Sequence, residues 1–169
     1  MRRVAILMAA SVIAALAGTA AMADEKKATV TYKTLTLETA LDLAQATLKA
    51  CRSEGFQIAV SVVDRGGNLQ VTLRDRFAGP HTPDTSYRKA WTAISFRTDT
   101  LELSKLTESG EAWAIRNVDK ALPLGGGVQI REGNGSLVGA VGVSGAPGGS
   151  SDDKCARAGI EAIADRISF

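Results

Sequence analysis

The chain has 169 residues, 45% of them hydrophobic, and its 20 basic residues exceed its 18 acidic residues by only two. This length predicts a single domain. The chain contains neither a Lys/Arg-rich run nor an aromatic platform, so we expect no nucleic-acid partner.

Residues 1–23 have the pattern of a secretory signal peptide. Arg2 and Arg3 form a basic start, Val4–Ala17 is an apolar run, and Ala21–Ala23 fits the small-x-small pattern before a cleavage point. The apolar run is too short to span a bilayer comfortably, although an uncleaved anchor is the alternative reading. We therefore expect a periplasmic or secreted protein without a membrane span after cleavage.

Cleavage would remove two arginines and leave 18 basic residues against 18 acidic ones, a net charge of zero. The remaining chain divides into a polar, Lys-rich arm over residues 24–34 and a folded domain over residues 35–169. The domain is long enough to form one hydrophobic core.

The pattern of apolar residues predicts helices grouped around two β-hairpins. Apolar residues spaced by three or four indicate helices, and β-branched or alternating residues indicate strands. In chain order, we expect a helix over 37–54, strands over 57–63 and 69–74, a helix over 85–96, short helical pieces over 98–106 and 109–117, strands over 124–131 and 137–143, and a last helix from Ser151 or Asp152. This order predicts an α+β fold with an antiparallel sheet of four to five strands covered by helices.

Local signals indicate where two of these helices begin and end. Thr36 is the expected N-cap of the first helix. Gly55, which readily adopts a left-handed conformation, is expected to end it. Asp84 or Thr82 can cap the helix over 85–96. We expect the apolar face of that helix to consist of Tyr87, Ala90, Trp91 and Ile94, and its other faces to carry Arg88, Lys89 and Thr92.

The two cysteines fall near helix ends. Cys51 lies near the end of the first predicted helix, and Cys155 near the start of the last. If these helices lie side by side and antiparallel, a disulfide is possible in an oxidising compartment. The alternative is two small buried residues on helix faces.

His81 is the only histidine of the chain and lies in the loop Phe77–Pro83. A single histidine cannot form a zinc site by itself, and neither cysteine stands at a metal-finger spacing. One imidazole does suffice as an axial ligand to haem iron, so His81 is the candidate metal ligand, and an exposed loop histidine is the alternative. Apolar side chains for the porphyrin and cations for its propionates would come from Phe77, Tyr87, Trp91, Arg88 and Arg97.

Two glycine-rich stretches are further candidates for ligand contacts. Gly142–Gly149 follows a strand and precedes a helix, so it forms either a structural loop or an anion cradle. Ser144 is not a hydrolase nucleophile, because Ala146 occupies the fifth position of the Gly-x-Ser-x-Gly pattern. Gly125–Gly127 form either a β-bulge or a point where a ligand approaches the backbone closely.

Four motifs occur in order: Val62–Leu69, Lys89–Ala93, Gly126–Ile130, and Val138–Gly145 followed by Asp152 and Asp153. Because these motifs occur in this order, the segment from Leu35 to Ile167 resembles the GlcG/HbpS-like haem-binding family. That family is related to the carboxy-terminal domain of PduO-type proteins. The resemblance implies an α/β/α layered, profilin-like unit, homo-oligomers that are often octamers, and haem as a cofactor. The loop Ala146–Ser150 departs from the pattern of many members, in which this loop is shorter.

Three hypotheses of function follow. The first is an exported, non-enzymatic protein that binds haem or senses haem or iron, with His81 on the metal. The second is an enzyme or accessory protein that binds a small acid or aldehyde, for which Asp64 or Glu111 would be the general base. The third is an oligomeric interaction module that presents hydrophobic helix faces to a partner.

Overall fold

Residues 28–168 are described by a computed structural model, in which Tyr32–Ser168 belong to one compact unit. The predicted signal peptide lies outside the described residues. The unit is built on one four-stranded antiparallel sheet with the strand order β2-β1-β4-β3. The strands are β1 (Ala59–Asp64), β2 (Leu69–Arg74), β3 (Gly127–Arg131) and β4 (Leu137–Ser144).

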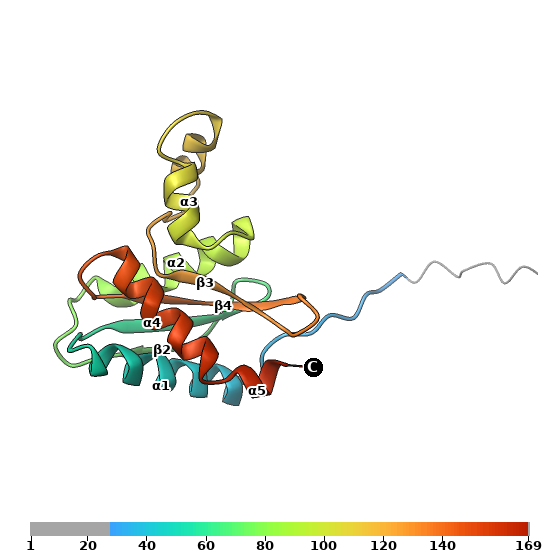
Figure 1. Ribbon diagram of the computed structural model, residues 1–169. Coiled ribbons are helices and arrows are strands. Elements are labelled where there is room, and N and C mark those ends of the chain that lie inside the picture. The colour runs from blue at the N-terminus through green and yellow to red at the C-terminus, as the bar shows by residue number, and fades with distance from the viewer. Residues whose placement is uncertain (1–27, 169) are drawn as a thin grey trace, which may run out of the picture. The chain divides into compact units, whose positions relative to one another are not determined.

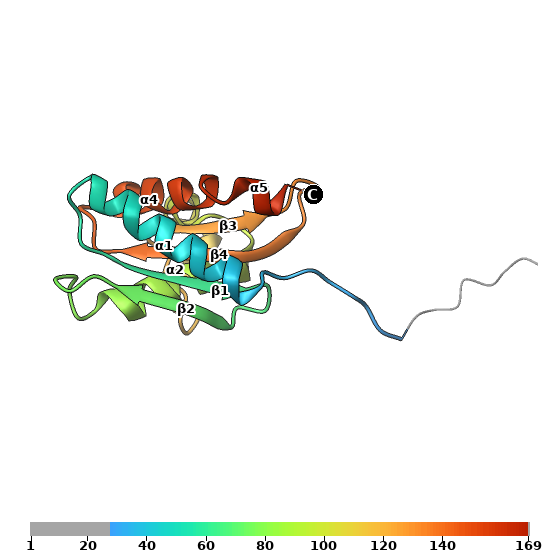
Figure 2. The ribbon, with the colours of Figure 1, turned by 90° about the horizontal axis from the view of Figure 1, so that it is seen from below.

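Helices cover both faces of the sheet (Figures 1 and 2). On one face lie α1 (Leu37–Ser53) and α4 (Gly149–Glu161), and α2 (Thr82–Phe96) covers the other. The alternation of the strands explains this layering, because neighbouring residues of a strand point to opposite faces. In β1, Val62 joins the core under α1 and α4, whereas Val63 packs with Ala90 and Ala93 of α2. The α+β prediction with helices on an antiparallel sheet is therefore confirmed, with four strands.

Three short elements complete the unit. They are α3 (Thr100–Leu106), the 3-10 helix η1 (Glu111–Asn117) and α5 (Ala164–Ile167). In Figure 1, α3 stands above α2 and β3, away from the three layers.

The predicted ends of α1 are confirmed, and those of α2 and α4 need correction. The Thr36 hydroxyl accepts a hydrogen bond from the Thr39 N–H at 3.2 Å. Helix α2 begins at Thr82, three residues earlier than predicted, and neither expected residue is its N-cap. The N-cap is His81, and Pro83, in the first turn, is tolerated there because the first helical N–H groups need no partner within the helix. Helix α4 begins at Gly149, before Ser151.

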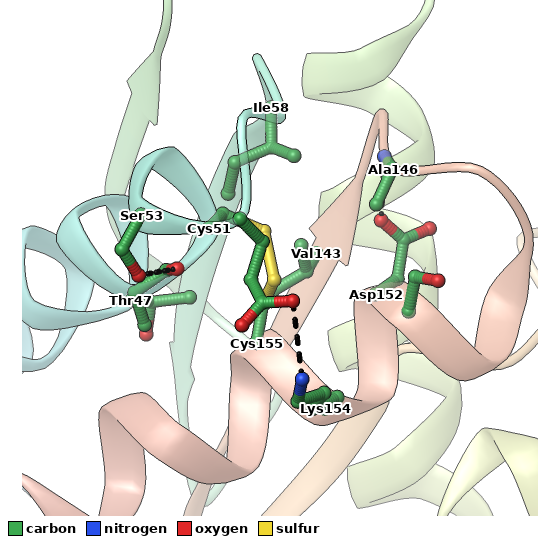
Figure 3. The surroundings of a disulfide bond; sticks show 12 residues. Thr47, Cys51, Ser53, Ile58, Val143, Ala146, Asp152, Lys154 and Cys155 are labelled. Carbon is green, nitrogen blue, oxygen red and sulfur yellow. Dashed lines mark hydrogen bonds and ion pairs between the residues drawn. A yellow bond between two sulfur atoms is a disulfide. The ribbon is translucent and has the colours of Figure 1, made fainter.

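Glycine allows two close helix contacts. A Cβ at Gly142 of β4 would lie 2.0 Å from the Ser86 carbonyl oxygen, so α2 rests directly on the strand backbone. A Cβ at Gly159 of α4 would lie 1.9 Å from the Thr47 hydroxyl of α1. One turn from this second contact, the structure joins Cys51 and Cys155 in a disulfide (Figure 3), which decides between the two alternatives left open by the sequence.

Candidate functional site

A cavity of about 470 Å³ lies at the N-terminal end of α2. It is formed where three parts of the chain meet: the start of α2, the segment that leads into β3, and the loop between β4 and α4. We call it the α2 N-terminal cavity. Its lining residues are Gly79, His81, Thr82, Thr85, Arg88, Lys89, Leu122, Leu124, Ser144, Gly145, Ala146, Gly148, Gly149 and Asp152.

His81 lies at the rim of this cavity with an exposed side chain. Its position depends on Gly79, because a Cβ at Gly79 would lie 2.8 Å from Cε1 of the imidazole ring. The backbone carbonyl of His81 accepts hydrogen bonds from Thr85, which fixes the residue at the start of the helix. The structure therefore leaves the ring accessible to a ligand that enters the cavity.

Arg88 lines the same cavity two turns further along α2. Its guanidinium donates hydrogen bonds of 3.3 and 3.4 Å to the backbone carbonyls of Lys120 and Ala121, and it lies 3.9 Å from the Asp84 carboxylate. These contacts are long, and the Asp84 side chain is 73% exposed, so the ion pair is weak. Arg88 is thus a cation that can exchange these partners for the acidic group of a ligand.

A buried ion pair forms the floor of the cavity. Lys89 Nζ lies 2.8 Å from Asp152 Oδ2 and donates a second hydrogen bond of 2.9 Å to the Val143 carbonyl. The two side chains are only 1% and 5% exposed. Burial lowers the pKa of Lys89 and raises that of Asp152, and the attraction between the two groups opposes both shifts.

The ion pair also fixes the loop before α4. Asp152 Oδ1 accepts a hydrogen bond of 3.0 Å from the Ala146 N–H, and Figure 3 shows this carboxylate pointing back at the loop. A Cβ at Gly126 would lie 2.6 Å from Cβ of Asp152 and 3.2 Å from Lys89 Nζ. The glycines at 125–127 therefore allow α2 and α4 to pack closely against the backbone of this segment.

The apolar pattern of α2 predicts that Lys89 and Thr92 lie away from its apolar face, and this prediction is wrong, because both side chains are buried. Lys89 is spaced by three and four residues from Ser86 and Ala93, which puts it on the stripe of α2 that faces the sheet. This spacing is the sequence signal that would have predicted its burial.

The structure does not bring the six predicted ligand contacts together. Only His81 and Arg88 line the α2 N-terminal cavity. Phe77 is 79% exposed, Tyr87 packs in the small core under α2, and Trp91 packs against Gly67 of the first hairpin. The apolar lining consists instead of Leu122, Leu124 and Ala146.

Arg97 lies at the opposite end of α2, where it is the C-cap. At a helical rise of about 1.5 Å per residue, its backbone is about 24 Å from that of His81. It lines a separate cavity. The structure thus separates the predicted cations into one at the His81 end and one at the far end of the helix.

The donor set of the cavity restricts the groups that it can hold. Among residues 28–168, no group of three or more His, Cys, Asp or Glu side chains is arranged to hold a metal ion. One accessible imidazole, one cation and two leucines suit a flat cofactor that needs a single ligand from the chain. In the same part of the chain, no helix combines the length and the apolar character needed to cross a bilayer.

Comparisons with known proteins agree with this fold. The sequence pattern of the family described as "Haem degrading protein HbpS-like" matches residues 35–161. A crystal structure of a double mutant of HbpS from Streptomyces reticuli is 36% identical, with a TM-score of 0.75, over 92% of this chain and 99% of that chain. The crystal structure of a complex of PduOC with heme is 28% identical, with a TM-score of 0.70, over 77% of this chain and 95% of that chain.

Two bacterial proteins are similar in sequence. One is an uncharacterized protein encoded in the dhaT-dhaS intergenic region of Citrobacter freundii, 34% identical over 66% of this chain and 80% of the relative. The other is the corrinoid adenosyltransferase PduO of Salmonella typhimurium, 31% identical over 61% of this chain. The match spans only 31% of that enzyme.

Proposed function

The chain belongs to the HbpS-like family, and from this premise we propose that it is a haem-binding protein whose site is the α2 N-terminal cavity. The observation that carries the proposal is that the chain's one histidine lies at the rim of a cavity in a fold shared with a solved heme complex. The match to that complex has a TM-score of 0.70 and covers 95% of the related chain.

Each of three features has a distinct part in the proposed complex. The His81 imidazole coordinates iron, and Gly79 leaves the space that this ring occupies. Arg88 pairs with a propionate in place of its weak contacts to Asp84 and two backbone carbonyls. Leu122 and Leu124 offer apolar surface to the porphyrin, and Leu124 is 46% exposed in the free chain. Bound haem would supply an iron centre that can bind small ligands or change oxidation state.

A hemin titration followed at the Soret band tests this assignment. We expect saturable binding by the wild-type chain, at least tenfold weaker binding with a shifted Soret band for His81→Ala, and weaker binding for Arg88→Gln. Arg76→Gln is the matched control, because Arg76 is an exposed arginine in the connection between β2 and α2 that does not line the cavity. Unchanged affinity and spectrum in His81→Ala would refute His81 as the ligand. The family description also names haem degradation, which a time course of the same band would detect.

We propose further that the protein is exported and binds or senses haem or iron outside the cytoplasm. The disulfide between α1 and α4 supports an oxidising compartment, because disulfides persist there and are rare in the cytosol. Thiol labelling of periplasmic and cytoplasmic fractions tests this: protein that occurs only in the cytoplasm with two free thiols would contradict it.

We propose that the protein forms a homo-oligomer, with an octamer as the candidate assembly. It is motivated by the family resemblance and by apolar side chains in the segment that leads from α3 to β3. Leu106, Trp113 and Val118 are 53%, 51% and 45% exposed. Burial of such side chains against another copy would be favourable. Light scattering that finds a stable monomer at micromolar concentration would refute this.

A small acid is the second candidate ligand. It is favoured by one observation: Arg88 and the backbone of Gly148 and Gly149 at the start of α4 line the same cavity. Glycolate and related small acids should then compete with hemin. Failure to compete at millimolar concentration, with hemin binding intact, would leave haem as the ligand.

A further inference from the structure

A second cavity, of about 350 Å³, lies at the C-terminal end of α2. Three of its six lining residues are arginines, and each comes from a different part of the fold: the turn after β1, the C-cap of α2 and the end of β3. No carboxylate lines it. The lining residues of this three-arginine cavity are Arg65, Ile94, Ser95, Arg97, Arg131 and Leu137.

The three guanidinium groups have no anionic partner within the described chain. Among residues 28–168, the ion pairs of the structure include none of these arginines. Arg131 donates to two neutral acceptors, the Gly135 carbonyl at 2.8 Å and Gln129 Oε1 at 2.6 Å, and these bonds hold its guanidinium in place. Arg65 lies over the ring of Tyr32, 5.4 Å from its centroid. Three like charges at one cavity repel one another, and an anion would relieve this repulsion.

The backbone conformation of Arg97 independently indicates a ligand site. Its φ of 51° and ψ of 36° are left-handed, and at helix C-termini glycine usually adopts this conformation. Gly55, which follows α1, has such a conformation, with a φ of 82°. An arginine at this position is strained, and strained residues of this kind cluster at ligand sites. Arg97 thus places a guanidinium group at this cavity even though its backbone conformation is strained.

We propose that the three-arginine cavity binds a small anion with a phosphate group. Guanidinium groups form paired hydrogen bonds with phosphate oxygens, and a phosphate has enough terminal oxygens to engage several arginines, whereas a carboxylate has two oxygens. Ile94 and Leu137 contact the apolar part of the ligand, and the volume lies within the range of small-molecule sites. The site is about 24 Å along α2 from His81, so it is independent of the proposed haem site.

Calorimetric titration with phenyl phosphate at constant ionic strength tests the proposal. We expect saturable binding by the wild-type chain and at least a tenfold weaker affinity for Arg131→Gln and Arg97→Gly, the loss typical of one charged hydrogen bond. Arg76→Gln is the control, because it removes an exposed arginine outside the cavity. Hemin binding should be the same in all four proteins.

Arg97→Gly separates a ligand role from a purely structural one. Glycine relaxes the left-handed backbone, so without phosphate this variant should have a Tm about 3 °C higher than the wild-type chain. The proposal predicts that this more stable variant no longer gains Tm from phenyl phosphate. No saturable binding by the wild-type chain, or equal binding by Arg97→Gly and Arg76→Gln, would overturn it. Benzoate that binds as tightly as phenyl phosphate would overturn the assignment to phosphate.

Discussion

Replacement of Lys89 by methionine should destabilise the protein strongly. Methionine has a similar length and fills the space of the lysine stem, so the change isolates the charge and its hydrogen bonds. It leaves the 5% exposed Asp152 carboxylate without its partner at 2.8 Å and the Val143 carbonyl without its donor at 2.9 Å. Breaking a buried pair on one side costs about 3–5 kcal/mol. We therefore expect the free energy of unfolding to fall by that amount.

A double-mutant cycle measures whether this loss arises from the pair. Asp152→Asn should also cost several kcal/mol, because it leaves Lys89 charged and buried. The combined variant removes both charges, and the asparagine can still accept from the Ala146 N–H, so it should lose only about 1–2 kcal/mol. The matched control is Lys154→Met in α4, the helix that carries Asp152. Its ion pair with Glu54 has side chains 71% and 46% exposed, and its loss should cost less than about 1 kcal/mol.

The pair should also give stability a specific pH dependence. The folded pKa of Asp152 is raised above 3.8, so the folded chain binds the extra proton and stability falls as pH rises through that acidic window. The folded pKa of Lys89 is lowered below 10.5, so the unfolded chain binds the extra proton and stability rises as pH approaches 10.5. The combined variant should lack both components.

Urea unfolding followed by circular dichroism, repeated from pH 4 to 10, provides these free energies. The reasoning is refuted if Lys89→Met costs no more than the exposed control. It is also refuted if the loss in the combined variant equals the sum of the two single losses, because the groups would then be energetically independent.

The remaining predictions concern the helices and the His81 ring. Replacing Cys51 and Cys155 together by alanine should lower the free energy of unfolding by about 4 kcal/mol, since the crosslink closes a separation of 104 residues; an unchanged urea midpoint would contradict this. Gly142→Ala should cost about 3 kcal/mol, because its Cβ would lie 2.0 Å from an oxygen of α2; a loss under 1 kcal/mol would argue against this packing. Gly79→Ala should weaken hemin binding by displacing His81, while the free energy of unfolding changes by less than about 1 kcal/mol; equal affinity would show that the ring is free to move.

Local patterns predicted most of the fold. Alternation around two glycines at residues 65–68 identified the first hairpin, and helical spacing between Thr36 and Gly55 identified α1. These features depend on contacts between residues close in sequence. Helix α2 began earlier than expected because proline is accepted in its first turn.

The site depends on contacts that are distant in sequence, and these were not predictable. The pairing of β1 with β4 brings the loop before α4 beside the start of α2, which joins Asp152 to Lys89 across 63 positions. The sequence also predicted that Arg97 and His81 contact the same ligand, whereas the two residues lie at opposite ends of α2. The disulfide could only be stated as an alternative, because its formation requires α1 and α4 to lie side by side.

The most direct test of the haem assignment is pulsed electron paramagnetic resonance on protein labelled with 15N-histidine and loaded with ferric hemin. The chain contains one histidine, so the label reports only on His81. We predict a hyperfine coupling between the iron and the labelled imidazole nitrogen, lost in His81→Ala. Bound haem without a 15N coupling in the wild-type chain would contradict the assignment.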